Sequence, residues 1–446
     1  MADQLLTVRA ARTGRSSLGD RVRQLRVARG LTQTELAGER FSKEYVSQIE
    51  RGKTRPTGET IEWLAVRLGV DQSFLETGIS SSERERAEST ISRAEAALES
   101  SRFEEAVDEL SKLAPSLAAV AAPDLEFRAL LAEAWGRMYT GDLRRALDLL
   151  GRARVLAEGA DFTDVDRAEV LFRLGSCRHK LNSISTAIAL FTEAYDVATR
   201  SGLPADRLRS RILERRARCF QRQRDFEAAR EDVERALELA QSMDDRRMIA
   251  NVYFQASLVS ERMGHLIASR NYAQQAKALY QELNDQRTVG RLMQNLGGLH
   301  LLLGKPEVAV EHLNASFALA VEADSKADAA LALGNLATVY LHTGDYDAAD
   351  DHARRGIALF EGREDFIQDI GQTNVVLGRS LMERGRLDEA EESFKVADQA
   401  FERLGSVSYR AGAWVALGDL ASRRGDDREA ARLYRNAAEA LQDIRF

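Results

Sequence analysis

The chain has 446 residues, of which 44% are hydrophobic and 30% charged, and its formal net charge is −7. A chain of this length and composition exceeds one ordinary core and is too apolar for a disordered protein, so we expect several domains or a repeat array. It contains two cysteines, no long apolar run and no hydrophobic leader, which excludes disulfide-stapled and membrane-spanning classes and predicts a cytoplasmic protein.

The charge is distributed unevenly along the chain. Residues 1–78 hold 13 Lys/Arg and 10 Asp/Glu, whereas the remainder holds 50 and 60. A basic head on an acidic body favours contact between the N-terminal part and phosphates. Residues 1–15 form a basic arm with Arg9, Arg12 and Arg15, for which insertion into a minor groove and plain solvation both stay open.

Residues 16–77 contain the start signals of short helices. Ser17 and Thr32 can cap the first two helices, and Glu35 completes a capping box with Thr32. Ser42 can cap a third helix, KEYVSQIE, and further helical segments follow it. We therefore expect a domain of five short helices.

The string LRVARGLTQTELAGERFSKEYVSQIERGKTRPTGETIEWLAVRLGV closely resembles the phage-repressor (Cro-like, XRE) helix-turn-helix family. The residues that stand where that family has them are Leu31-Thr32-Gln33, Leu36-Ala37, Ser42, Ile49-Glu50-Arg51-Gly52-Lys53 and Pro56. One departure is that the segment between Leu36 and Ser42 is one residue shorter than is usual, which leaves the angle between the two helices open.

This resemblance implies that the helix after Ser42 enters the major groove of DNA, with Val46 and Ile49 turned into the domain core. Lys can donate to guanine, Gln can pair with adenine, and Glu can accept from cytosine. The residues expected to contact base edges are Lys43, Glu44, Ser47 and Gln48. The residues expected to bind DNA around that helix face are Gln33, Ser42, Lys53 and Arg55. Gln33 would reach a phosphate or brace the recognition helix, and a domain retained only for protein contact is the alternative.

After a linker at 78–86, residues 87–446 repeat one pattern about every 40 residues. Nine candidate inter-helix turns lie 40 to 42 residues apart, at Ser101, Gly141, Asn182, Arg224, Gly264, Gly304, Gly344, Gly385 and Gly425. Small side chains recur seven residues before each turn and five and twelve residues after it, except for Leu113. A plain helical bundle would not keep this register, so the pattern predicts stacked helix pairs.

The repeat resembles the tetratricopeptide repeat, most closely in GAWVALGDLASRRGDDREAARLYRNAAEAL and HTGDYDAADDH. The resemblance implies a right-handed superhelix of about nine repeats, with a concave wall that binds peptides or helices. The predicted fold is therefore all-α, with a five-helix repressor-like domain followed by this array.

Polar side chains recur at the positions that would line this concave wall. They are Arg173, Arg211, Arg215, Arg218, Asn251, Gln255, Arg291, Asn295 and Asn335. Asn can hold the backbone of an extended peptide, and Arg suits a carboxylate. These residues could instead satisfy one another or face water.

The combination of the two modules is similar to the peptide-pheromone-sensing transcription regulators of Gram-positive bacteria. It implies a homodimer that binds double-stranded operator DNA and senses a short peptide. A protein-interaction hub, in which the array docks a protein partner, is the alternative. No catalytic or cofactor motif is found, the six histidines do not cluster as metal ligands, and Cys177 and Cys219 are expected to be buried thiols.

Overall fold

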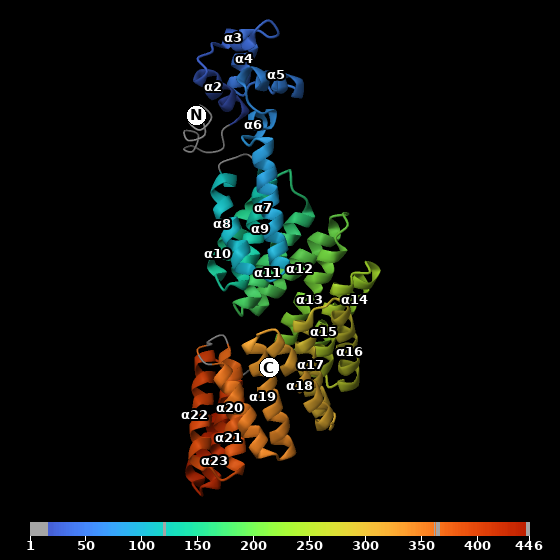
Figure 1. The fold of residues 1–446 in the computed structure, drawn as a ribbon, viewed down its shortest axis with the longest axis vertical. Helices are drawn as coiled ribbons and strands as arrows, with labels where there is room; N and C mark the ends of the chain where they lie inside the picture. Colours follow the sequence, from blue (N-terminus) through green and yellow to red (C-terminus); the bar gives the residue numbers. More distant parts are fainter. Residues whose placement is uncertain (1–16, 119–121, 361, 363–365, 443–446) are drawn as a thin grey trace. The chain divides into compact units, whose positions relative to one another are not determined.

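The computed structural model describes residues 17–118, 122–360, 362 and 366–442, so the basic arm at 1–15, with Arg9, Arg12 and Arg15, lies outside the described residues. Within these ranges the secondary structure is entirely helical, which confirms the all-α prediction (Figure 1). The chain divides into two compact units, residues 1–223 (unit 1) and residues 224–446 (unit 2).

The first five described helices form the N-terminal domain that the sequence predicts. They are α2 (Leu18–Ala28), α3 (Gln33–Ala37), α4 (Lys43–Glu50), α5 (Gly58–Leu68) and α6 (Gln72–Thr77). Their shared core contains Val22, Leu36, Val46, Ile49 and Leu64, each at most 1% exposed. Burying such apolar side chains stabilises this small domain by about 25 cal/mol per Å² of surface removed from water.

Side-chain caps fix the starts of these helices as predicted. Ser17 with Asp20, and Thr32 with Glu35, form capping boxes at α2 and α3. The segment after α6 differs from the expected linker at 78–86, because a third capping box, of Ser80 and Glu83, starts α7 at residue 81. The covalent connection between the domain and the array is therefore short and mostly helical.

The rest of the described chain forms nine helix pairs, numbered here from repeat one to repeat nine. The pairs are α7 (Ser81–Glu99) and α8 (Phe103–Ala118), α9 (Pro123–Tyr139) and α10 (Leu143–Ala157), α11 (Asp164–Lys180) and α12 (Ile184–Arg200), α13 (Asp206–Arg222) and α14 (Phe226–Ser242), α15 (Arg246–Arg262) and α16 (Leu266–Glu282), α17 (Gln286–Leu302) and α18 (Pro306–Glu322), α19 (Lys326–Thr343) and α20 (Tyr346–Leu359), α21 (Ile367–Glu383) and α22 (Leu387–Leu404), α23 (Val407–Arg423) and α24 (Asp427–Gln442). This count confirms the predicted number of repeats.

The turns inside the pairs share one backbone conformation. All nine predicted turn residues have positive φ, between 59° at Ser101 and Asn182 and 92° at Gly141. Glycine adopts this left-handed region without steric cost, and six of the nine turn residues are glycine. Ser101 and Arg224 hold the same conformation with a Cβ atom.

In several pairs, a small side chain on the first helix meets a large one on the second. A Cβ added to Gly175, seven residues before its turn, would lie 2.8 Å from the ring of Phe191, nine residues after the turn. Gly378 and Phe394 repeat this relation at 2.4 Å. The glycines thus create the space that the aromatic rings fill, which explains the register of small residues.

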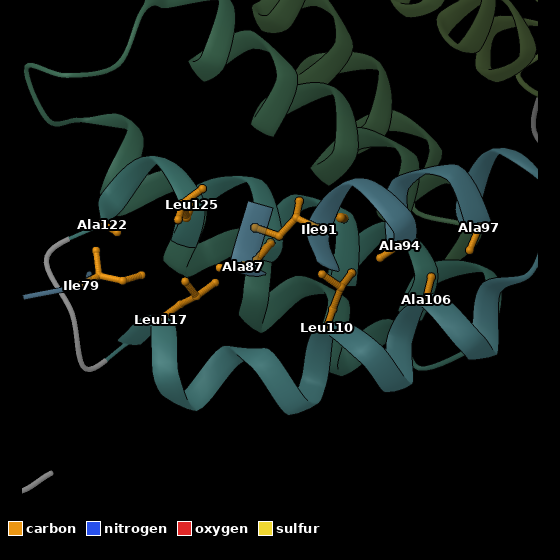
Figure 2. Packing of buried hydrophobic residues seen from close by; sticks show 12 residues of the cluster. Ile79, Ala87, Ile91, Ala94, Ala97, Ala106, Leu110, Leu117, Ala122 and Leu125 are labelled. Atoms are coloured by element: carbon orange, nitrogen blue, oxygen red, sulfur yellow. The ribbon is translucent and has the colours of Figure 1, made fainter. Parts of the chain in front are cut away.

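Figure 2 shows how the first repeat joins its neighbour. Ile91 and Ala94 of α7, Leu110 of α8 and Leu125 of α9 belong to one buried cluster and are at most 1% exposed. Ile79, from the turn before α7, belongs to the same cluster. The first pair therefore buries its apolar face partly against the second, as a repeat array requires.

No helix in the described part of the chain is long and apolar enough to cross a bilayer.

Candidate functional site

The helix α4 has one buried and one exposed face. Val46 and Ile49 are each 1% exposed and belong to the domain core, as predicted. The side chains of Lys43, Glu44 and Gln48 are exposed. These three residues, with the partly exposed Ser47, fall on one face because residues four apart are neighbours on a helix.

The short segment before α4 is closed by aromatic contacts. The ring of Phe41 lies 5.2 Å from that of Tyr45 and 5.1 Å from that of Trp63, measured between centroids. Arg67 of α5 stacks on Trp63 and donates to the carbonyl of Glu35 at 2.7 Å. These contacts connect the shortened turn to α5, and Ser42 then caps α4 by accepting from the backbone N–H of Tyr45.

A buried carboxylate supports α4 from behind. Glu50 is 8% exposed and accepts from Arg26 Nε at 2.5 Å, from Arg26 Nη2 at 3.0 Å and from Gln33 Nε2 at 2.8 Å. Burial alone would raise the pKa of Glu50, but the hydrogen bonds from Arg26 and Gln33 outweigh it, so the pKa lies below its ordinary value. Gln33 thus contacts the end of α4 through Glu50, which is the contact that its expected bracing role would need.

Arg26 and Glu50 received no role from the sequence. They are 24 residues apart, so no local spacing rule pairs them. Gly19 was also missed: a Cβ there would lie 2.4 Å from the carbonyl oxygen of Ile49, so glycine lets α2 approach the end of α4. The sequence offers one signal for the buried carboxylate. Glu50 is the last residue of α4 and directly follows the apolar Ile49.

The side chain of Gln48 has a partner that the sequence did not indicate. The hydroxyl of Thr54 donates to Gln48 Oε1 at 3.0 Å, which leaves the Gln48 amide N–H groups free to point outward. Lys53 and Arg55, on either side of Thr54, are exposed. Of the predicted DNA-binding residues, six are therefore exposed, whereas Ser47 is partly exposed and Gln33 is half-buried beside Glu50.

In unit 1, the predicted ligand-binding arginines occur together on α11 and α13. Arg173 and Arg211 share the carboxylate of Glu169, at 2.8 Å and 3.5 Å. Arg215 donates to the hydroxyl of Tyr139 at 3.3 Å. Arg218, one turn further along α13, forms an ion pair within that helix, with Glu214 at 2.5 Å.

In unit 2, Asn295 is engaged inside the array. Its Oδ1 accepts from Ser257 at 3.0 Å, and its Nδ2 donates to Glu261 at 3.2 Å. Ser257 is fully buried and contacts Ser269 Oγ at 3.2 Å. Asn295 therefore completes a buried hydroxyl network between repeats five and six.

The other predicted residues of unit 2 differ in exposure. Asn251 accepts from the hydroxyl of Tyr280, and Gln255 is only 1% exposed. Arg291 is exposed and contacts Asp328 at 3.4 Å. Asn335 is exposed and forms no hydrogen bond to any described residue. Of the amide residues predicted in unit 2, Asn335 is thus the most available to a ligand.

Both cysteines are buried, as the sequence predicts. Burial raises the pKa of Cys177 and of Cys219 to about 11, against the smaller effect of nearby cations. The two thiols are therefore protonated at neutral pH and serve as small apolar side chains.

Comparison with known proteins finds matches to both the N-terminal domain and the repeat array. A helix-turn-helix domain model matches residues 17–76, and tetratricopeptide repeat models match residues 131–204, 288–362 and 413–445. The sequence is 42% identical over 64 residues to the uncharacterized HTH-type transcriptional regulator y4dJ of Sinorhizobium fredii, which is 14% of this chain and 83% of that protein.

A second relative, the HTH-type transcriptional regulator DdrOP3 of Deinococcus deserti, is 40% identical over 63 residues. That match covers 14% of this chain and 49% of the relative, so the chain spans about half of its length.

The repeat array is similar to solved structures at low sequence identity. The apo form of the quorum sensor NprR from B. thuringiensis aligns with 80% of this chain and 99% of its own, with a TM-score of 0.58 and 15% identity. This likeness shows a shared fold.

Proposed function

The chain belongs to the helix-turn-helix family of transcriptional regulators, and from that premise we propose that α4 reads base edges in the major groove while the repeat array binds a regulatory ligand. One observation carries the first half: an exposed polar face on α4 lies opposite the side chains that anchor this helix in the core. Helices of this kind present their N-terminal half to base edges.

The residue chemistry suggests a division of labour. Lys43 donates to guanine and Glu44 accepts from cytosine, whereas the outward amide of Gln48 donates to a base acceptor. Lys53 and Arg55 contact phosphates, which fix position without reading sequence. Ser42 and Gln33 keep α4 in place through its N-cap and through Glu50.

The ligand half of the proposal rests on the resemblance to peptide-sensing regulators and on the polar residues of the array. A short peptide would meet Arg173, Arg211, Arg215 and Arg218 in unit 1, or Asn335 in unit 2. We propose that a homodimer binds a two-fold operator, with half-sites about 34–36 Å apart, and that the ligand changes its DNA affinity.

The DNA proposal is tested by selecting binding sites from a random duplex library with the purified protein. We expect Gln48→Ala and Lys43→Ala to weaken the selected site by about tenfold and to relax the base preference at one position each. Lys53→Ala should weaken all sequences alike and reduce the salt slope by about one. Arg144→Ala, on the exposed surface of α10, serves as the control.

The sensing proposal is tested by footprinting on that site with and without short peptides extracted from cells that carry the gene. A change in affinity or protected length supports it. Unchanged footprints, together with a stoichiometric protein captured by the array, would favour the interaction hub. Absence of any salt-sensitive attachment to DNA would overturn the DNA-binding half.

A further inference from the structure

Repeats three and four carry an unusual concentration of positive charge. The helix α13, DRLRSRILERRARCFQR, contains seven arginines in 17 residues. Four of them adjoin two basic side chains of α11, and we call this group the basic face: Arg173, Lys180, Arg211, Arg215, Arg218 and Arg222. Both helices belong to unit 1.

Aromatic rings hold two of these arginines in fixed orientations. The guanidinium of Arg173 lies 5.1 Å from the centroid of Trp135, and that of Arg211 lies 4.5 Å from the centroid of Phe172. A guanidinium over a ring is attracted to the π face and can keep its N–H groups directed sideways. Part of the entropic cost of ordering these long side chains is therefore met before any ligand arrives.

Tyr139 of α9 connects the cations of the two helices. Lys180 Nζ lies 4.6 Å from the centroid of its ring, and Arg215 Nη2 donates to its hydroxyl at 3.3 Å. Arg222, at the end of α13, donates to Asn182 Oδ1 at 3.2 Å, next to the end of α11. Lys180 and Arg215 thus share one ring, and Arg218 and Arg222 lie near them, since all four cations act on His179.

The carboxylates within this group do not balance its charge. Glu169 pairs with Arg173 and Arg211, and Glu214 pairs with Arg218. Lys180, Arg215 and Arg222 form no ion pair with a carboxylate of any described residue, so the group carries a surplus of positive charge. Lys180 and Arg222, both exposed, belong to this surplus.

His179 reports the field that the surplus creates. Burial, and then the charges of Arg222, Arg215, Arg218 and Lys180, lower the pKa of His179 to about 4. The imidazole is consequently neutral at physiological pH. Four separate cations acting on one ring agree with the geometry that places them together.

A comparable cluster in unit 2 is balanced. Asp350 receives Arg354, Arg384 and Arg386, and two further carboxylates, Asp347 and Glu389, contact the same three arginines. Three cations there meet three carboxylates. The surplus of unit 1 is therefore not a general property of inter-repeat ion pairs in this chain.

We propose that the basic face binds an acidic peptide segment through its side-chain carboxylates. Glu169 provides the template, because it already sits between two of these arginines as a ligand carboxylate would. Nucleic acid fits less well, since Trp135, Phe172 and Tyr139 are covered by the protein's own cations and do not offer stacking surfaces to bases. This inference rests on the proposed ligand-sensing function and gives the ligand its chemical class.

The test uses the full chain and a fluorescein-labelled peptide of alternating glutamate and alanine, with a peptide of alternating glutamine and alanine for comparison. Binding is followed by anisotropy at several salt concentrations. We expect the glutamate peptide to bind and its affinity to fall as salt rises, while the glutamine peptide does not bind. The double variant Lys180→Gln/Arg222→Gln should lose at least about tenfold in affinity, since each charge-assisted hydrogen bond is worth about that factor.

The matched control is Arg144→Gln/Arg154→Gln, which removes the same charge from exposed positions of α10 in the same unit. Its affinity should stay within about twofold of the parent. Equal loss in both variants, equal binding of both peptides, or displacement of the peptide by a lower concentration of single-stranded DNA or polyphosphate would overturn the proposal.

Failure here is distinguishable from failure of the sensing function, because the peptide assay contains no operator DNA. Peptide binding that depends on Lys180 and Arg222 but leaves operator affinity unchanged supports the basic face and contradicts sensing. Sensing by host peptides that survives the double variant unchanged contradicts the basic face and supports sensing.

Discussion

Units 1 and 2 carry polar side chains at the same register position, nine residues before the turn, and use them differently. In unit 1, Arg173 lies over Trp135 and Arg215 reaches Tyr139, and both belong to a group with excess positive charge. In unit 2, Asn295 is held by Ser257 and Glu261. A register position therefore tells which face a side chain occupies, but its neighbours decide whether a ligand can reach it.

The neighbours differ for a physical reason. The small positions of repeat three are Gly175 and Ala187, which need no hydrogen-bond partner. In repeat five the equivalent residues are Ser257 and Ser269, both fully buried, and buried hydroxyls require partners. The next repeat supplies one through Asn295, so this amide is occupied by the array itself.

The largest expected effect on stability comes from enlarging one of the small residues that lie seven positions before a turn. Gly175→Ala would place a Cβ 2.8 Å from the ring of Phe191, and we expect a loss of about 2–3 kcal/mol in the free energy of unfolding of unit 1. Urea unfolding followed by far-UV circular dichroism measures it. Adding Phe191→Leu should recover part of the loss, because the smaller side chain returns the space.

Gly151→Ala is the control for this substitution. Nothing lies within 4 Å of a Cβ at Gly151, which is exposed on α10, so the helix should gain about 0.5–1 kcal/mol. Equal stabilisation by both substitutions would show that helix propensity, and not the ring of Phe191, decides the effect of Gly175→Ala.

The charge surplus of unit 1 predicts a pH effect of intermediate size. The folded pKa of His179, about 4, lies below the unfolded value near 6.5, so the unfolded state binds more protons between these pH values. Stability is therefore lost as pH falls from 6.5 toward 4. His179→Gln should remove about 1–2 kcal/mol of that loss, allowing for solvent screening of a partly exposed group.

The measurement is the difference in unfolding free energy between the parent and His179→Gln across this pH range. High salt should shrink the difference, because it screens the four cations that act on the ring. His300→Gln in unit 2 is the comparison: burial is the largest cause of the lowered pKa at both histidines, but two cations act on His300 and four on His179, so salt should matter less at His300. Identical salt dependence at both sites would contradict a special field in unit 1.

Asn295 and Asn335 of unit 2 allow a side chain that is engaged inside the array to be compared with one that a ligand can reach. Asn295→Ala removes bonds to Ser257 and Glu261 and should cost about 1 kcal/mol, whereas Asn335→Ala, which removes none among the described residues, should change stability by less than about 0.5 kcal/mol. Thermal unfolding of the two variants measures this. Equal effects would mean that Asn295 is as available to a ligand as Asn335.

How much of this molecule the sequence predicts depends on the range of the interactions involved. The fold follows from local and periodic signals: Thr32 with Glu35, Ser42 as a cap, and turn residues such as Gly264 at a constant spacing. Such signals either act within one helix or recur at a fixed spacing along the chain, so they can be recognised from the sequence alone.

The candidate site depends on pairs that no spacing rule connects. Glu50 meets Arg26 and Gln33 across three helices, and Thr54 reaches Gln48 around the end of α4. The register did identify Arg173 and Arg215, but it missed Lys180 and Arg222, which lie at the helix ends. It also could not decide whether Asn295 binds a ligand or is engaged inside the array, because the need of the buried Ser257 hydroxyl for a partner appears only when two repeats are stacked.

The smallest expected effect concerns the turn that begins unit 2. Arg224 holds a φ of 64° where most repeats have glycine, it is exposed, and its side chain makes no hydrogen bond or ion pair to any described residue. Arg224→Gly relieves the steric cost of this conformation but increases the entropy of the unfolded chain, so we expect a net gain of only about 0.5 kcal/mol. The reverse change at an equivalent turn, Gly264→Ala, at a φ of 79°, should cost about 1 kcal/mol. Differential scanning calorimetry of both variants compares them, and a loss of stability in Arg224→Gly would mean that the arginine stabilises this turn through its side chain.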